Sequence, residues 1–343
     1  NDTYKTIMDR GAAAPRVSSV NIAGGRRWRI RGLDISPSHA TGAQARNPDR
    51  IVSLGERGDD RTSDLVIEDC YIHSVEDASG WSARDWIDKA SSGLWLGRHG
   101  RGLVARNNYI RNVRFGIDLC APDSLCEGNV VENFSADGIR VTRDGQTVRF
   151  NVVRNNFVGA GDGDGNHDDA IQAFLFNAGR GLLRNVTVCD NLLVERARPG
   201  LPFPNPLQGI GFFDGPLTNF VVEGNVALVG SYHGVSLYDA QGCTIRSNLC
   251  FNPGLPGGHL PWLMIGGKRG VAFGNTVQDN FAHSFSLKAD PAVQGARNEA
   301  VSRDGANRRT ADLARAIDGR FGRLHAAAAR LRFPDGFLSG MFP

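Results

Sequence analysis

The chain contains three copies of one short motif: Asn108-Tyr109-Ile110-Arg111-Asn112, Asn129-Val130-Val131-Glu132-Asn133 and Asn151-Val152-Val153-Arg154-Asn155. The copies begin 21 and 22 residues apart, and Cys70 stands in the equivalent place before them. Asparagines in equivalent positions continue the series at Asn191, Asn225, Asn248 and Asn275. A repeat of this length, rich in β-branched residues, is typical of parallel β-coils that bury an apolar face only by stacking. We therefore predict an all-β fold, a right-handed parallel β-helix with the asparagines stacked at one corner.

A second landmark in each coil is a small residue followed by an apolar one, where a second strand should begin. The stretch between asparagine and landmark varies most in length, so long insertions should leave the coil at one corner. They would then wall a groove on one side of the solenoid. The landmarks are Ser92-Gly93-Leu94, Phe115-Gly116-Ile117, Asp137-Gly138-Ile139, Asp169-Ala170-Ile171, Gln208-Gly209-Ile210 and His233-Gly234-Val235.

Three large insertions carry aromatic residues or charges: 74–92, 157–169 and 196–208. Aromatic side chains can stack on the apolar faces of sugar rings. We expect Trp81 and Trp86 to contact a carbohydrate, with Phe203 in the same groove wall; packing within the loops is the alternative explanation.

Alignment on the landmarks predicts two vertical files of side chains. One file contains Asp137, Asp169, Gln208 and His233; the other contains Trp95, Asp118, Arg140, Gln172, Gly211 and Ser236. Neighbouring coils lie about 4.8 Å apart. Asp137 should therefore lie beside Asp169, with Asp118 about two rungs away. Two carboxyl groups at such separations can carry glycoside hydrolysis. The alternative for Asp137 is a turn residue that bonds its own backbone.

The segment 161–169 is the most acidic of the chain, with four aspartates and one histidine. Clustered carboxylates raise one another's pKa, which suits acid–base chemistry. We expect Asp137, His167, Asp168 and Asp169 to be catalytic, a solvated acidic loop being the alternative. The substrate-binding residues expected around them are Trp81, Trp86, Trp95, Asp118, Arg140, Arg143, Gln172, Gln208, His233 and Lys268.

We expect that the reaction requires no cofactor. The one metal ion that the sequence suggests is Ca²⁺. Asp162, Asp164 and Asn166 have the spacing of oxygen ligands for Ca²⁺, although the glutamate that ends a calcium loop is absent.

Composition excludes several partners. The net charge of +3 lacks the clustered basic residues that nucleic acid needs, and no run of about 18 apolar residues could span a membrane. The six cysteines show no metal-binding spacing, so we expect free thiols packed in the solenoid. A disulfide between Cys120 and Cys126 is the alternative. The first residues, Asn-Asp-Thr-Tyr, show no signal region, which suggests a processed product.

The predicted organisation has three parts: an N-terminal segment 1–19, the β-helix 20–285 and a C-terminal extension 286–343. Alanine, leucine and arginine between 308 and 331 favour helix. That helix would cap the open end of the core, or alternatively join copies of the chain in a homo-oligomer.

The repeat from Val20 to Phe285 resembles the pectate-lyase-like superfamily of right-handed β-helices. Within it, Asp137-Gly138, Asp168-Asp169 and His233-Gly234 follow the order of three motifs of polygalacturonases. That resemblance implies inverting hydrolysis of a polysaccharide by aspartates. Ser135-Ala136 stands where that family has Asn-Thr, and Lys268-Arg269 replaces its Arg-Ile-Lys at a different spacing.

Asn166-His167-Asp168 is similar to the Asp-Pro-His-Asp segment of mannuronan C5-epimerases. That resemblance implies His167 as a base, with Arg140, Arg143 or Lys268 neutralising a uronate carboxylate. Phage tailspikes use the same solenoid to bind polysaccharide. We therefore predict an enzyme that cleaves a polysaccharide or oligosaccharide, an acidic or bacterial exopolysaccharide, in an open groove by carboxylate-based glycoside hydrolysis. The alternatives are a uronate-directed lyase or C5-epimerase, and a polysaccharide-binding or tailspike protein without catalysis. The resemblances imply an extracellular, periplasmic or virion-associated protein.

Overall fold

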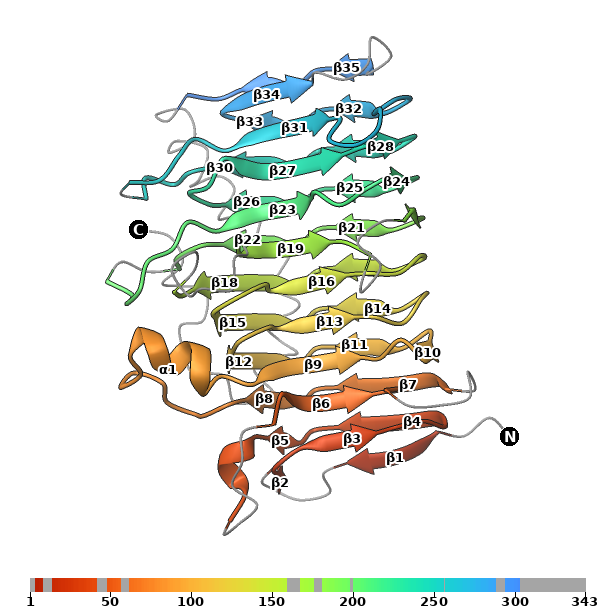
Figure 1. Cartoon of the computed structure of the whole chain (residues 1–343), viewed down its shortest axis with the longest axis vertical. Coiled ribbons are helices and arrows are strands. Elements are labelled where there is room, and N and C mark those ends of the chain that lie inside the picture. The colour runs from red at the N-terminus through yellow and green to blue at the C-terminus, as the bar shows by residue number, and fades with distance from the viewer. Residues whose placement is uncertain are drawn as a thin grey trace.

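The computed structural model describes residues 4–8, 14–41, 48–56, 62–158, 167–175, 181–197, 200–255, 257–287 and 294–302. Their strands form three long parallel sheets that run the length of an elongated stack (Figure 1). Each coil contributes one strand to each sheet in turn. The predicted right-handed parallel β-helix is confirmed.

The three sheets contain strands of two to seven residues. The first sheet comprises β1 (Lys5–Met8), β4 (Arg26–Arg31), β7 (Thr62–Glu68), β10 (Gly100–Arg101), β11 (Val104–Arg106), β14 (Leu125–Glu127), β17 (Thr147–Arg149), β21 (Thr187–Cys189), β25 (Val221–Glu223), β29 (Thr244–Arg246), β32 (Thr276–Gln278) and β35 (Gln294–Ala296). The second sheet comprises β2 (Arg16–Val17), β5 (Asp34–Ile35), β8 (Tyr71–His73), β12 (Tyr109–Val113), β15 (Val130–Phe134), β18 (Val152–Asn156), β22 (Leu192–Val194), β26 (Val226–Leu228), β30 (Leu249–Phe251), β33 (Phe281–Ala282) and β36 (Glu299–Ala300).

The third sheet is the one on which the predicted site lies. It comprises β3 (Val20–Ile22), β6 (Arg50–Leu54), β9 (Ser92–Leu96), β13 (Ile117–Leu119), β16 (Ile139–Val141), β19 (Asp169–Ala173), β23 (Gln208–Phe212), β27 (His233–Tyr238), β31 (Trp262–Gly266) and β34 (Ser284–Leu287). The remaining elements are β20 (Leu183–Arg184), β24 (Leu217–Thr218) and β28 (Ala240–Gln241) in a small fourth sheet, the helix α1 (Ala83–Asp88) and the 3-10 helix η1 (Pro37–His39). No helix of the described part is long and apolar enough to cross a membrane.

Equivalent residues of successive coils stack because the strands pair in register. Ile110 pairs with Val131, and Val131 pairs with Val153. All three are fully buried in one continuous apolar core. The interior of the solenoid is therefore filled by rows of like side chains.

The corner between the first and second sheets holds the predicted asparagine ladder. The side-chain amide of each asparagine donates to the side-chain oxygen of the next, from Asn108 to Asn129 at 2.9 Å onward. The backbone N–H of Cys70 donates to Asn108, as its equivalent position predicts. One member was assigned wrongly. Asn248 donates to Asn280, and Asn280 donates to Asn298, so Asn275 is not in the ladder.

Asn275 caps a different corner. Its side-chain oxygen accepts from the backbone N–H of Cys243 at 2.9 Å, and its amide donates to the carbonyl of Ala240. It precedes β32 of the first sheet, whereas the ladder asparagines precede strands of the second sheet.

The ladder should contribute strongly to stability. Asn151 is fully buried, donates to Asn191 and to the carbonyl of Cys126, and accepts from the backbone N–H of Asn129. Asn151→Ala leaves several of these buried groups unpaired, so the free energy of unfolding should fall by about 2–4 kcal/mol. Denaturant unfolding measures the change. The exposed Asn21 supplies the control: if Asn21→Ala costs as much, the ladder has no special role.

The cysteines and the inserted loops agree with expectation. All six cysteines are free thiols, and five of them are buried. The described parts of the three insertions meet on one side of the solenoid: Trp86 packs on Phe157 at 5.0 Å, and Phe157 forms a β-bridge with Pro204. Figure 1 shows α1 projecting at this corner, between the second and third sheets.

The strands run past both ends of the predicted range 20–285. β1 and β2 precede residue 20, and β35 and β36 follow residue 285. The predicted C-terminal helix of 308–331 lies outside the described residues.

Candidate functional site

The outer face of the third sheet carries one vertical file of side chains, as predicted. Pairing in register links Trp95 to Asp118, Asp118 to Arg140, and Arg140 to Gln172. The file continues through Gly211 and Ser236. Two members of the predicted second file, Asp169 and Gln208, also pair in register.

Contacts between residues three positions apart join the two files. The side chain of Arg140 donates to Asp137 at 2.6 Å, and that of Gln172 donates to Asp169 at 3.1 Å. His233 and Ser236 make the same contact at 2.7 Å. We call the joined files, from Trp95 to Ser236, the polar band.

Asp137 is fully buried and uses both of its carboxylate oxygens. Oδ1 accepts from the backbone N–H of Asp169 in the next coil at 3.0 Å, and Oδ2 accepts from Nε of Arg140. Burial raises the pKa of Asp137, whereas the neighbouring Arg140 acts to lower it. Asp137 therefore does not bond the backbone of its own turn, which was the alternative. Its carboxylate connects two coils and holds Arg140 in place.

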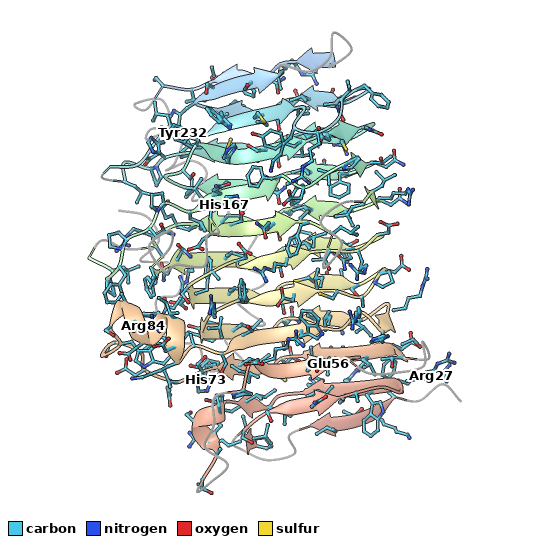
Figure 2. The ribbon with its side chains drawn as sticks, in the orientation of Figure 1. Arg27, Glu56, His73, Arg84, His167 and Tyr232 are labelled. Carbon is cyan, nitrogen blue, oxygen red and sulfur yellow. The ribbon has the colours of Figure 1, made fainter. Side chains whose placement is uncertain are left out.

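Asp169 holds an imidazole. Its Oδ2 lies 2.9 Å from Nδ1 of His167, while its buried Oδ1 has no hydrogen-bond partner among the described residues. Burial raises the pKa of Asp169 to about 7. The hydrogen bond to Asp169 raises the pKa of His167. The side chain of His167 is 48% exposed, so it is the part of this pair that a ligand meets first (Figure 2).

The close packing at Asp169 depends on Gly211. A Cβ on Gly211 would lie 2.0 Å from Oδ1 of Asp169 and 2.5 Å from the ring of Phe213. The gap in the file at Gly211 is therefore the space into which Asp169 fits.

Asp118 lies on the other side of Arg140. Nη1 of Arg140 is 3.6 Å from Oδ1 of Asp118, and the guanidinium also stacks on Phe115 at 3.6 Å. Burial raises the pKa of Asp118 to about 6, although Arg140 acts to lower it. One guanidinium thus serves two buried carboxyl groups.

Asp168 faces the inserted loop. Its Oδ2 accepts from the side-chain amide of Asn205 at 2.9 Å, and Asn205 also donates to Asn156. These contacts tie loop 196–208 to the second sheet. Asn205 was not identified from sequence, since nothing in its local pattern marks it.

His233 lies near the C-terminal end of the polar band and is a candidate for contact with a ligand as a neutral imidazole. Nε1 of Trp262 lies 3.1 Å from Nδ1 of His233. Because a tryptophan N–H only donates, Nδ1 must accept and the ring proton lies on Nε2. Burial lowers the pKa of His233 to about 4, with a further contribution from His167. Phe213, also missed from sequence, packs edge-on between His167 and His233 at 4.9 Å from each.

The other predicted residues occupy varied places. Trp86 is 2% exposed and packs between Trp81 and Phe157, so its packing serves the loop rather than a substrate, contrary to expectation. Trp95 is buried under the guanidinium of Arg50 at 3.6 Å. The other three lie along the band or at its edge. Oε1 of Gln208 is buried and has no hydrogen-bond partner among the residues that the structure describes. Arg143 donates to the carbonyl of Thr142, and Lys268 lies 3.6 Å from Asp214.

The calcium prediction falls on Asp162, Asp164 and Asn166, which lie outside the described residues. Among the described side chains, one group at the N-terminal end has the chemistry and spacing of metal ligands: Asp34, His39 and His73.

Comparison with known proteins agrees with this architecture. Residues 18–172 match the family model described as the right handed beta helix region. No curated protein matches the chain. Among solved structures, the chain is similar to the Dettilon tailspike protein at 13% identity and a TM-score of 0.50, covering 87% of this chain and 58% of the tailspike.

Two enzymes are also among the similar structures. The alginate lyase from Paenibacillus sp. str. FPU-7 is 15% identical over 86% of this chain and 82% of that one, with a TM-score of 0.40. DFA-IIIase from Arthrobacter chlorophenolicus A6 is 12% identical over 84% and 82%, with a TM-score of 0.46. The similarity to the tailspike, at 13% identity, shows the fold alone.

Proposed function

We propose that this protein is a carbohydrate-active enzyme that cleaves a polysaccharide on the polar band, by glycoside hydrolysis that uses carboxyl groups. The observation that carries the proposal is the cluster around Arg140: Asp118, Asp137 and Asp169 are buried together, and the pKa of each is raised by burial. A carboxyl group whose pKa lies near neutral pH, as that of Asp169 does at about 7, can take part in proton transfer during catalysis.

The charge of the cluster favours hydrolysis. Three buried carboxyl groups face one guanidinium and one imidazole. Such a site stabilises positive charge better than negative charge. The transition state of glycoside hydrolysis resembles an oxocarbenium ion and gains positive charge. A neutral or weakly acidic glycan therefore fits the cluster better than a dense polyanion.

We assign the roles by contact and exposure. His167 and Asp169 form one proton-transfer unit, in which the exposed imidazole meets the glycosidic oxygen and the buried carboxyl supports it. Asp118 is the second carboxyl and activates water; its Oδ1 has no hydrogen-bond partner within the described part of the chain and faces Arg140 at 3.6 Å. Asp137 positions Arg140 and the backbone of Asp169.

The separation of the carboxyl groups bears on stereochemistry. Asp118 and Asp169 lie on strands that are two rungs apart, an offset of about 9.6 Å along the solenoid axis at the usual strand spacing. Retaining glycosidases need their carboxyl groups about 5 Å apart, whereas inverting enzymes hold them farther apart. Because an offset of two rungs is too long for retention, inversion is the expected outcome.

One observation favours a second candidate, a uronate lyase or C5-epimerase. His167 is the most exposed titratable group of the cluster and could abstract a proton, with Arg140 as the neutralising cation. Against this candidate, Arg140 is already occupied by Asp137 and Asp118.

Product analysis on a panel of neutral and acidic bacterial polysaccharides tests the proposal. We expect new reducing ends without the ultraviolet absorbance of an unsaturated uronate. Appearance of that absorbance would establish the lyase instead, and exchange of the C5 proton in heavy water without cleavage would establish the epimerase. If oligosaccharides bind the band and neither reaction occurs, the protein is a binding module.

A further inference from the structure

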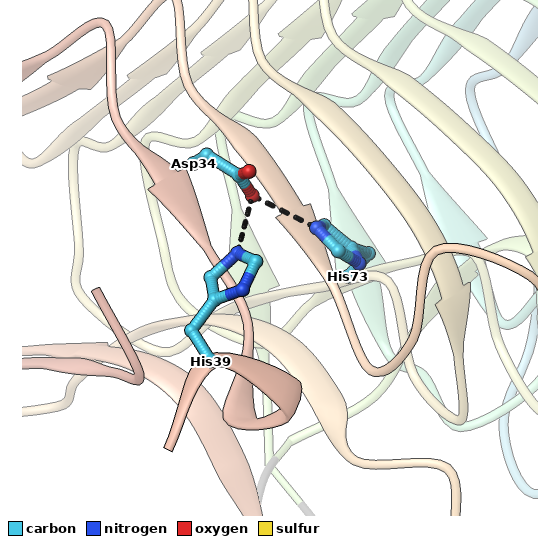
Figure 3. A group of neighbouring side chains, drawn as sticks. All are labelled: Asp34, His39 and His73. Carbon is cyan, nitrogen blue, oxygen red and sulfur yellow. Dashed lines mark hydrogen bonds and ion pairs between the residues drawn. The ribbon is translucent and has the colours of Figure 1, made fainter. Parts of the chain in front are cut away.

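Three side chains at the N-terminal end of the solenoid converge on one point (Figure 3). Nε2 of His39 and Nε2 of His73 each lie 2.9 Å from the same carboxylate oxygen, Oδ1 of Asp34. The three ligand-type atoms all lie within 4.8 Å of one another. The other oxygen of Asp34 faces Arg16 at 3.3 Å.

The backbone fixes all three side chains independently of any ligand. Asp34 begins β5 and pairs with Tyr71 of β8, the strand that His73 ends. His39 ends η1, whose first residue is Pro37 and whose N-cap is Ser36. The Ser36 hydroxyl also donates to the carbonyl of Ser74 in the next coil. The group is therefore preorganised across two successive coils.

The three side chains are largely buried. The side chain of His73 is 1% exposed, and those of Asp34 and His39 are 15% exposed. The ring of Tyr71 stacks on His73 at 4.1 Å and limits its rotation. Because fixed ligands lose little entropy on binding, such a site can hold an ion tightly.

We propose that Asp34, His39 and His73 bind a divalent transition-metal ion of the Zn²⁺ type. Two imidazole nitrogens and one carboxylate oxygen suit Zn²⁺, whereas Ca²⁺ and Mg²⁺ prefer oxygen ligands alone. A tetrahedral ion about 2.1 Å from each ligand places the ligand atoms about 3.4 Å apart. The 2.9 Å contacts therefore need to open by only a fraction of an ångström.

For each neutral imidazole to bind the ion through Nε2, its ring proton must lie on Nδ1, so the two contacts to Oδ1 of Asp34 are replaced by bonds to the ion. Three protein ligands leave one coordination position for water. The ion would join η1 to β5 and β8, at the corner where insertion 74–92 leaves the coil. It lies near the end of the stack, so this site is independent of the hydrolytic centre proposed for the polar band.

The untagged protein, treated with a chelator and dialysed, is titrated with Zn²⁺ while bound metal and Tm are measured. We expect one equivalent of Zn²⁺ and a Tm rise of several degrees, because an ion that binds only the folded state stabilises it. His39→Ala should weaken Zn²⁺ binding at least about 100-fold and abolish the Tm response. His259→Ala, which alters an exposed histidine far along the chain, should change neither.

Equal Zn²⁺ affinity of wild type and His39→Ala would overturn the proposal, as would failure of wild type to bind Zn²⁺. His39 is chosen because it ends a short helix and is more exposed than His73, so its loss should lower the Tm in chelator less than loss of His73 would. If His39→Ala fails to fold, Co²⁺ added to wild type decides instead. A visible absorption band of a four-coordinate nitrogen–oxygen site supports the proposal, and its absence refutes it.

Discussion

Asp169→Asn is expected to reduce kcat by about 10²- to 10⁴-fold on any glycan that the enzyme accepts, the usual loss when an acid–base group is removed. Asparagine keeps the shape of the side chain but cannot carry the charge that raises the pKa of His167. The pKa of His167 would then be lower, so less of the imidazole would be protonated near neutral pH. The pH profile of the residual activity should accordingly shift to lower pH.

The control is Asp88→Asn, because Asp88 is an exposed carboxylate of α1 that pairs with Arg84 on the same helix. Its kcat should stay within about twofold of wild type, as for a peripheral contact. A matched Tm for Asp169→Asn shows that the fold is retained. Near-normal turnover by a folded Asp169→Asn protein would exclude the proposed centre.

Much of the fold could be predicted because its cause is local. A parallel coil stacks only if each turn presents the same side chains to its neighbours, so the pattern is repeated in the chain. The register follows from that repetition, and with it the file Trp95, Asp118 and Arg140. The error at Asn275 has the same origin. Asn275 also precedes a β-branched strand and also accepts a backbone N–H from the preceding coil, so its local sequence resembles a ladder position.

The site could be predicted where its residues lie on the regular strands or directly before them. Phe213 and Asn205 reach the cluster from turns and loops, whose path no periodicity defines. The burial of Trp86 follows from α1, which turns that side chain inward. The helix had a recognisable signal, since Ser82 and Asp85 form a capping box at its start.

Arg140→Met should have the largest effect on stability. Arg140 is the cation between Asp137 and Asp118, and its guanidinium covers Phe115. Methionine retains apolar contact but removes the guanidinium that pairs with both buried carboxyl groups. Breaking a buried ion pair from one side costs about 3–5 kcal/mol. Denaturant unfolding at neutral pH measures this loss, and Arg84→Met on the exposed face of α1 should leave the Tm unchanged.

The pH dependence distinguishes lost charge from lost packing. Arg140 acts to lower the pKa of Asp118 and of Asp137, so its removal should raise both in the folded state. A carboxyl group whose folded pKa exceeds its unfolded pKa stabilises the fold at low pH, and that stability is lost as pH rises through the folded pKa. The deficit of Arg140→Met relative to wild type should therefore be small near pH 4 and large near pH 8. A deficit that is equal at both pH values would show that Arg140 acts through packing, and that its charge does not hold the carboxyl cluster together.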